Sequence, residues 1–313
     1  MTTTIVKDRR RSTTRRSAKP RRDVTSSDLP LRDDGKVDLV KVLEFALTAP
    51  GHLSKCYNRF HRYSLLNIIM VLMQTGKMEP MATFNRWKSL GRNVTKGSKA
   101  LWVNHPRFAP ERDSDGLPVV GKDGKVEMKV VGFYPKATVF QLHQTEGPDL
   151  KMPELPEWDR EQAAKVLELN EVPFEYHDGN AQGYSTGRDY AINPVAEYPI
   201  KTLFHEWGHI LCGHTTGDDN APMHRGVREF QAEAVALLVC KELDVKEYDP
   251  AACRGYIQNW LQGQSAEYLD DDGNLAVTDA VVRQIFAAAD KILTAGRKSH
   301  YDKMEADRDN AQR

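Results

Sequence analysis

Two histidines with a glutamate between them are the residues whose types and spacing carry the clearest chemistry. His205, Glu206 and His209 lie in the segment KTLFHEWGHILCGH, whose apolar residues recur at helical spacing. Histidines four positions apart share one helical face, about 5 to 6 Å apart at Cβ, so both imidazoles can reach one ion. The glutamate after the first histidine reaches a metal-bound water in this motif. The sequence therefore predicts His205 and His209 as metal ligands and Glu206 as a general base.

A third ligand is expected elsewhere in the chain, because catalytic zinc takes three protein ligands and leaves one position for water. The segment REFQAEAVALLVC has the composition of a packed helix, with Glu229 and Glu233 four residues apart on one face. A buried carboxylate needs a metal, a cation or hydrogen-bond donors. We assign Glu229 as the ligand and Glu233 as the acceptor of a hydrogen bond from a ligand histidine. The reverse assignment stays open, because spacing does not rank two carboxylates on one face.

This set of residues predicts one Zn²⁺ per chain and the chemistry of a zinc metalloendopeptidase. The metal would lower the pKa of its water and polarise a carbonyl, while Glu206 takes the proton and passes it to the leaving amine. An alternative from another class is a binding protein whose zinc site is structural or vestigial. A donor to the oxyanion is also needed. The weak candidates for it are Tyr184, Tyr190, His214 and His224.

The first half of the chain is basic and the second half acidic, although the formal net charge is zero. Residues 1–148 carry 27 Lys and Arg against 14 Asp and Glu, and the remainder carries 17 against 30. Between Pro80 and Pro110 there is no acidic residue, and cations alternate with aromatic rings. Cations attract phosphates and aromatic rings stack on bases, which favours single-stranded DNA as a partner. The expected contact residues are Arg86, Lys88, Arg92, Lys96, Lys99, Trp87 and Trp102.

An alternative for this basic segment is a solvated face over a core that uses the aromatic side chains, Trp87 above all. Residues 1–27 hold nine basic side chains and almost nothing apolar, so they are expected to be a disordered arm. Periodicity predicts helices over 37–48, 63–74 and 159–169, and strands at 101–103 and within 126–147. The expected division is an arm at 1–27, a domain at 28–148, a linker at 149–158, a second domain at 159–297 and a tail at 298–313.

Neither a membrane nor an export route is indicated. The longest apolar run, 65–73, is far shorter than the roughly 20 residues that span a bilayer. No apolar stretch follows the arginines at the N-terminus, as a secretory signal would require. The four cysteines form no C-x-x-C pair, so a cytoplasmic location is expected.

Several segments together resemble a known family. FNRWKSLGRNVTKGSKALWV resembles the W-x-x-x-G-x-x-V-x-K-G-x-K-x pattern in the N-terminal domain of ArdC-type antirestriction proteins, and YSLLN and VFQLHQTEG lie where that domain has similar segments. GYSTGRDYAINP, HEWGH and EFQAEAVALLVC are similar to the zincin-like domain that follows in ArdC and to the related ImmA/IrrE peptidases. By position, the family's metal and base residues fall on His205, Glu206, His209 and Glu229.

The resemblance implies an α+β fold, in which a small domain that binds single-stranded DNA precedes a zincin-like (gluzincin-type) metallopeptidase domain. That second domain would contain a small sheet and the H-E-x-x-H helix. The resemblance also implies a mobile element in a bacterial host cell, and protection of incoming plasmid or phage DNA from restriction. The protein substrate stays open. A peptidase that cleaves a repressor, as in the ImmA/IrrE proteins, is an alternative.

Overall fold

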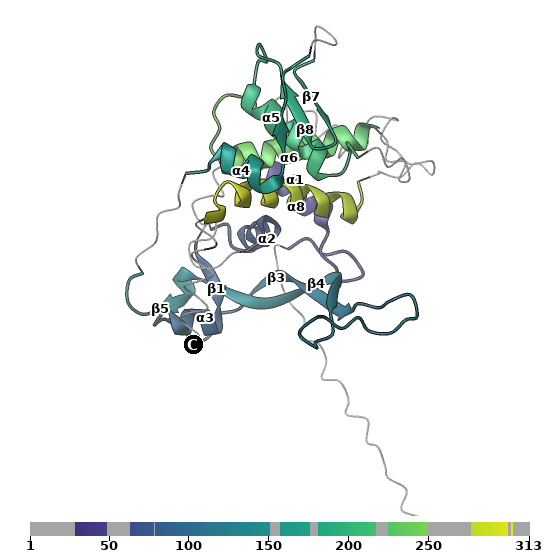
Figure 1. Ribbon diagram of the computed structural model, residues 1–313. Coiled ribbons are helices and arrows are strands. Elements are labelled where there is room, and N and C mark those ends of the chain that lie inside the picture. Colours follow the sequence, from purple (N-terminus) through teal and green to yellow (C-terminus); the bar gives the residue numbers. More distant parts are fainter. Residues whose placement is uncertain are drawn as a thin grey trace, which may run out of the picture.

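The computed structural model describes residues 29–48, 63–77, 79–150, 157–175, 181–216, 225–249, 277–299 and 302. The expected arm at 1–27, His224 and nearly all of the expected tail beyond residue 299 lie outside these residues. Within them the fold is α+β, as the sequence predicts. Figure 1 shows a helix-rich part with the small strands β7 and β8, and below it an elongated pair of strands, β3 and β4.

The first two helices form where periodicity predicts them. α1 is Leu39–Thr48 and α2 is Leu65–Thr75. Ser64 caps α2 by accepting the backbone N–H of Asn67, and Gly76 ends it with a φ of 62°, a left-handed conformation that glycine adopts without strain. Nearly every residue from 65 to 72 is buried, so α2 is covered on almost all sides.

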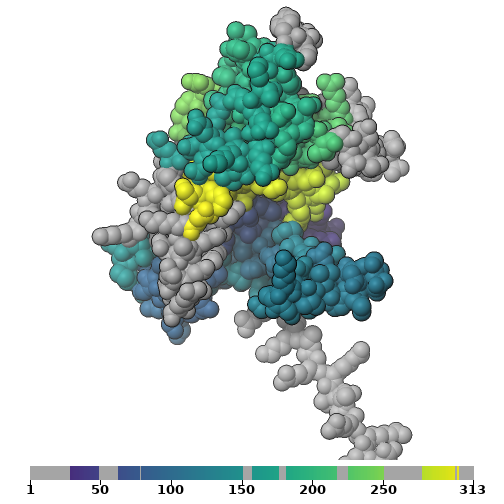
Figure 2. All heavy atoms as spheres, viewed as in Figure 1, coloured from purple at the N-terminus to yellow at the C-terminus, as the bar shows by residue number. Residues whose placement is uncertain are grey.

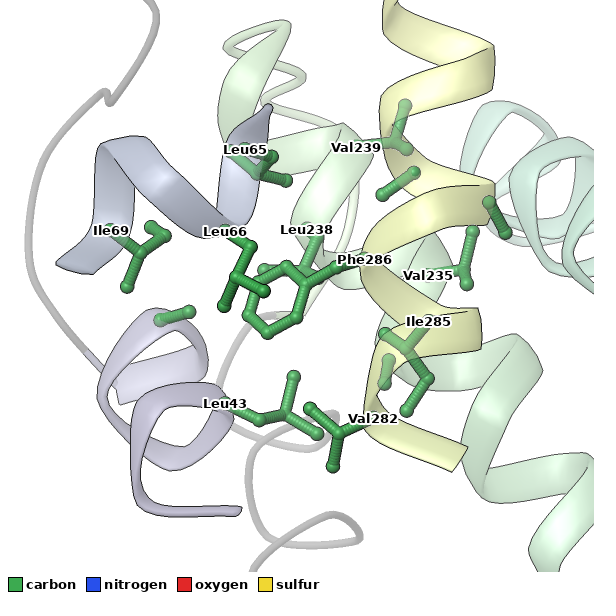
Figure 3. Packing of buried hydrophobic residues seen from close by; sticks show 14 of the residues in the cluster. Leu43, Leu65, Leu66, Ile69, Val235, Leu238, Val239, Val282, Ile285 and Phe286 are labelled. Carbon is green, nitrogen blue, oxygen red and sulfur yellow. The ribbon is translucent and has the colours of Figure 1, made fainter. Parts of the chain in front are cut away.

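The covering of α1 and α2 comes from the far end of the chain. Both helices contact α8, Asp279–Ala295, and α1 also contacts α6, Arg225–Glu242. In Figure 3 the ring of Phe286 on α8 lies among Leu43, Leu66 and Leu238, which belong to α1, α2 and α6. The described parts of 28–148 and 159–297 therefore share one hydrophobic core. The boundary predicted at 149–158 divides the sequence, but it does not separate two hydrophobic cores.

A three-stranded antiparallel sheet follows α2 in the order β1-β4-β3. Its strands are Met81–Thr83, Met128–Gln141 and Leu101–Pro110, and α3, Phe84–Ser89, follows β1. Within 126–147, where the sequence predicts strands, the structure has the long strand β4, a 3-10 turn at Leu142–Gln144 and the two-residue strand β5, Thr145–Glu146. β5 pairs with β2, Asn93–Val94.

The outer edge of β3 is covered by side chains of α2. Asn67 donates its amide N–H to the carbonyl of Asn104 (3.1 Å) and accepts the N–H of the same residue (2.8 Å). Gln74 does the same with Trp102, at 2.9 Å in both directions. Two amides seven residues apart on α2 thus take the place of a neighbouring strand. This pairing fixes α2 against the sheet and satisfies backbone groups that an edge strand would otherwise expose.

Replacement of both amides is expected to loosen this contact. The double variant Asn67→Leu, Gln74→Leu removes the four hydrogen bonds that join α2 to β3, each with a net contribution of about 1 kcal/mol, so the free energy of unfolding should fall by about 2 to 4 kcal/mol. Urea denaturation of the full chain measures this loss. Thr75→Val is the control, because the Thr75 hydroxyl bonds to backbone groups of Val71 and Lys77 in the same segment and not to β3. An equal loss in the control and the double variant would contradict this account.

The second half begins with α4, Arg160–Leu167, whose N-cap Asp159 accepts the backbone N–H of Gln162 at 2.7 Å. A second small sheet has the order β6-β8-β7, in which β7 is an edge strand. Its strands are Asn170–Glu171, Asp189–Ile192 and Gly183–Thr186. α5, Pro199–Leu211, packs against β7 and against α6. No helix in the described part of the chain has the length and apolar character needed to cross a membrane.

Candidate metal centre

Three candidate ligands converge between α5 and α6. The Oε2 atom of Glu229 lies 3.4 Å from Nε2 of His205 and 3.5 Å from Nε2 of His209. The two Nε2 atoms are 3.1 Å apart, and one atom from each of the three residues lies within 4.8 Å of the others. Two imidazoles and a carboxylate are a ligand set that suits Zn²⁺. The residues present therefore fit one divalent cation.

Gly208 allows α5 and α6 to approach closely enough for this convergence. A Cβ atom at Gly208 would lie 3.0 Å from Cα and 3.1 Å from the carbonyl oxygen of Ala232 on α6. Both of these neighbours are backbone atoms and cannot rotate away. The glycine inside the H-E-x-x-H motif thus sets the spacing between the helix that carries the histidines and the helix that carries Glu229.

The ionisation of the cluster follows from its contacts. The hydrogen bond from His205 is the largest of the contacts that hold the pKa of the Glu229 carboxyl well below its usual range. Burial lowers the pKa of His205, but hydrogen bonds to Glu229 and Glu233 outweigh it and raise the pKa to about 9. His205 is therefore protonated near neutral pH when no cation is bound. A cation placed among the three ligands would replace that proton, since only a bare ring nitrogen coordinates a metal.

Glu206 is oriented by the neighbouring strand. Its side chain is buried, and its Oε2 atom accepts the hydroxyl of Ser185 on β7 at 2.7 Å. Both residues line a pocket of about 580 Å³ that also includes His205, His209 and Glu229. Ser185 could not be predicted from its position in the sequence, because only the packing of β7 on α5 brings it to the motif. Glu206 thus lies beside the three candidate ligands with its carboxylate held from one side.

Glu233 lies behind His205, on the opposite side of the ring from Glu229. Its Oε2 atom is 3.1 Å from Nδ1 of His205 and 2.6 Å from Nζ of Lys201. The same carboxylate oxygen therefore binds a ring nitrogen and an ammonium group. With Nδ1 of His205 donating to Glu233, its Nε2 atom faces Glu229.

The weak candidates for an oxyanion donor lie in different places. Tyr190 is almost fully buried and its hydroxyl donates to Glu171 at 3.4 Å, while the hydroxyl of Tyr184 donates to the carbonyl of Pro173 at 3.3 Å. His214 lines the pocket, but its Nδ1 atom lies 2.9 Å from Nδ1 of His209, behind that ring. In the described residues none of the three is aimed at the point where the candidate ligands meet.

Two of the predicted DNA-contacting residues are parts of the core. Trp87 is fully buried, and its indole N–H donates to the carbonyl of Phe140 at 2.9 Å. Arg92 is 8% exposed, and its guanidinium donates to Thr145 and to the carbonyls of Gly147 and Pro148. We correct the expectation for Trp87 and Arg92, because one has no free ring face and the other has its donors engaged. The alternative of a structural aromatic holds for Trp87.

The other predicted DNA contacts lie nearer the surface. Lys88, Lys96 and Lys99 are exposed, and Arg86 and Trp102 are partly buried. Beyond them, β3 and β4 carry no acidic residue. This strand pair exposes large apolar side chains, including Phe108 at 55% and Phe133 at 47%.

The fold and the site together define an α+β protein with a His-His-Glu cluster that fits a divalent cation. Residues 45–140 match the model of the N-terminal domain of anti-restriction factor ArdC. This match confirms the resemblance drawn from the sequence for the residues that it covers.

Similarity to individual proteins is more distant. The DNA primase TraC of Escherichia coli is 26% identical over 230 residues, which cover 67% of this chain and 16% of TraC, so the chain spans about a sixth of that relative. The crystal structure of the antirestriction ArdC protein from the R388 plasmid, in metal-free form, aligns with a TM-score of 0.45 and 19% identity, covering 88% of this chain and 99% of the other. Its Mn(II)-bound form gives 0.43 and 18%, covering 87% and 96%.

Proposed function

We propose that this protein is a zinc-dependent metallopeptidase whose metal is held by His205, His209 and Glu229. The observation that carries the proposal is the convergence of these three side chains next to a buried glutamate, at the wall of an open pocket. A purely structural zinc site has four protein ligands and needs no base. Three ligands with Glu206 beside them favour a hydrolytic site over the alternative of a structural one.

The residues around the cluster have separable tasks in this reaction. Zn²⁺ bound there would supply a Lewis acid that activates water and polarises the scissile carbonyl. Glu206 accepts the proton of the attacking water and delivers it to the leaving amine, while Ser185 holds one carboxylate oxygen in place. Glu233, itself fixed by Lys201, holds the His205 ring so that its Nε2 atom points toward Glu229.

The surroundings of the pocket favour a peptide as the substrate. β7 is the edge strand of its sheet, and Gly183 and Ser185 of this strand line the pocket beside Glu206. An extended peptide can add to a sheet edge through its main chain, which brings one of its peptide bonds past the site. The cluster would then act on a bond that the strand has aligned.

The direct test is the search for newly formed peptide ends. The zinc-loaded full chain is incubated with a denatured bacterial protein extract, and new N-termini are labelled and identified by mass spectrometry. We expect new termini with the wild type, and none after chelation or with Glu206→Gln. A parallel incubation with labelled DNA distinguishes a nuclease. Cleavage of DNA without any new peptide ends would contradict the proposal.

A second activity, binding of single-stranded DNA, is favoured by the β3–β4 pair. Arg107 lies over the ring of Tyr134, 5.9 Å from its centroid, and His105 packs against the same ring. Phe108 is more than half exposed, and β3 and β4 together contain cations but no acidic residue. The far end of the pair projects from the body of the molecule (Figure 2). Exposed rings among cations are the combination that stacks bases and attracts phosphates.

Removal of one exposed ring tests this second activity. Stacking contributes about 1 to 3 kcal/mol per base, so Phe108→Ala should weaken binding of a single-stranded oligonucleotide by roughly 5- to 150-fold. Fluorescence anisotropy at fixed salt measures the change. Leu117→Ala is the matched control, since Leu117 is 63% exposed but lies in a loop with Asp113 and Asp115. Equal affinity of wild type and Phe108→Ala would refute the placement of DNA on β3 and β4.

Together, the two activities support an antirestriction role like that named for the ArdC relatives. In this role the protein acts in the cytoplasm of a bacterium that receives the DNA of a mobile element. Entry of a plasmid with restriction sites into a restricting host, with and without the protein, measures protection. We expect protection to be lost with Glu206→Gln. Full protection by that variant would favour the alternative in which the protein shields DNA by binding alone.

A further inference from the structure

A chain of hydrogen bonds leads from His209 away from the metal centre to the last long helix. The Nδ1 atom of His209 is 2.9 Å from Nδ1 of His214, whose Nε2 atom is 2.9 Å from Oε1 of Gln231. The Nε2 atom of Gln231 donates to the carbonyl of Val281 at 3.3 Å and to Oε1 of Gln284 at 2.9 Å. The chain thus joins α5, the turn after it, α6 and α8.

The carbonyl of Val281 sets the direction of this chain. A backbone carbonyl can only accept, so the amide nitrogen of Gln231 must face α8 and its oxygen must face His214. The side chain of Gln284 alone would leave the direction open, because its own amide can turn. Gln231 is fully buried, so surface water does not offer its amide an alternative orientation. The amide oxygen of Gln231 is therefore a fixed acceptor below His214.

The protons on both imidazoles follow from this acceptor. Because Oε1 of Gln231 accepts, Nε2 of His214 carries a proton and donates it. In a neutral imidazole one ring nitrogen donates and the other accepts, so with its proton on Nε2 the Nδ1 atom of His214 is an acceptor. The Nδ1 atom of His209 then carries the proton between the two rings, and the Nε2 atom of His209 is left with a lone pair.

We propose that His214 and Gln231 are positioning residues that fix the tautomer of His209, so that its Nε2 lone pair is presented to the metal. The inference rests on the proposed function, in which His209 is a ligand, and adds a role for residues outside the H-E-x-x-H motif. In the opposite tautomer, Nε2 of His209 would present a proton to the cation, and two lone pairs would face each other between His209 and His214.

The two ligand histidines are held by chemically different partners. Nδ1 of His205 faces the charged pair formed by Glu233 and Lys201, whereas Nδ1 of His209 faces a neutral chain. The cluster already contains the carboxylates of Glu206 and Glu229. A glutamine at position 231 provides an acceptor without adding another buried negative charge beside them.

The test combines metal affinity with a direct observation of the protons. Gln231→Leu has a similar volume but no acceptor, and we expect its affinity for Zn²⁺ to fall about 10- to 100-fold, as for other losses of a partner behind a ligand histidine. Gln284→Leu is the matched control with unchanged affinity, because Val281 still orients Gln231. Long-range ¹H–¹⁵N spectra of the metal-free full chain should show the proton of His209 on Nδ1 and that of His214 on Nε2.

Each result decides a different point. A proton on Nε2 of His209 together with a bare Nδ1 atom, or wild-type zinc affinity in Gln231→Leu, overturns the inference. The spectra do not require hydrolysis or bound metal, so they remain decisive if Gln231→Leu fails to fold. If the wild type shows the expected tautomers but binds no zinc, the proposed function fails, and the fixed tautomers remain as an observed property of the chain.

Discussion

Replacement of Glu206 by glutamine is expected to abolish hydrolysis while leaving zinc in place. Glutamine has the same shape and can still accept the hydroxyl of Ser185, but it cannot take up a proton from water. Loss of a general base lowers a rate by about 10²- to 10⁴-fold. The turnover of a cleaved peptide should fall by at least the lower of these factors, and metal analysis should give the same zinc content as for the wild type.

The variant Ser185→Ala tests how much the orientation of Glu206 contributes to turnover, apart from its transfer of a proton. This variant keeps the carboxylate of Glu206 and removes only the hydroxyl that holds it, so we expect a smaller loss of turnover with unchanged zinc content. If Glu206→Gln were as active as the wild type, Glu206 would not be the base. Loss of zinc in Glu206→Gln would instead place Glu206 among the ligands.

The second large effect concerns the two glutamates of α6. Glu229 lies at the Nε2 atoms of both histidines, whereas Glu233 lies at the far nitrogen of His205, Nδ1, and at the ammonium group of Lys201. Glu229→Gln should therefore eliminate stoichiometric zinc binding at micromolar protein. Glu233→Gln should retain binding with about 10- to 100-fold lower affinity. Competition with a chromophoric chelator measures both affinities and decides the assignment that spacing leaves open.

Thermal unfolding provides an independent readout for the same pair. A ligand present at 100 times its dissociation constant stabilises the folded state by about 2.7 kcal/mol. The wild type and, at sufficient zinc, Glu233→Gln should show a higher midpoint with metal than without it. Glu229→Gln should show no difference. Glu233→Gln also leaves Lys201 without its carboxylate partner, which lowers stability with or without zinc. Each variant is therefore compared with its own metal-free form, so that this loss cancels. A zinc-dependent rise of the midpoint in Glu229→Gln but not in Glu233→Gln would make Glu233 the ligand.

The parts of the site that could be predicted from the sequence are those within one helix. His205, Glu206 and His209 are fixed relative to one another by helical geometry, and the pairing of Glu229 with Glu233 follows from the same rule. Ser185, His214 and Gln231 gain their contacts only when β7, the turn after α5 and α8 pack together. These contacts form between separate elements, so the spacing of residues within one helix or strand does not predict them.

In the basic segment, residue types alone do not predict which side chains are buried and which are exposed. Trp87 and Lys88 are neighbours on α3, yet one is fully buried and the other exposed. In a helix of six residues, periodicity is too short to identify the inner face. The shared core was predicted only in part: periodicity predicts a helix over 63–74, and the structure has α2 there, buried on almost all sides. The sequence did not reveal that α8 supplies part of that cover.

The central claim is that His205, His209 and Glu229 hold a single divalent cation. Metal analysis of the full chain, purified after zinc loading and removal of free metal, tests it most directly when paired with His205→Ala. We expect one zinc per wild-type chain and none per His205→Ala chain, with both proteins folded by circular dichroism. Wild-type protein without zinc, or a His205→Ala variant that keeps its full equivalent, would contradict it.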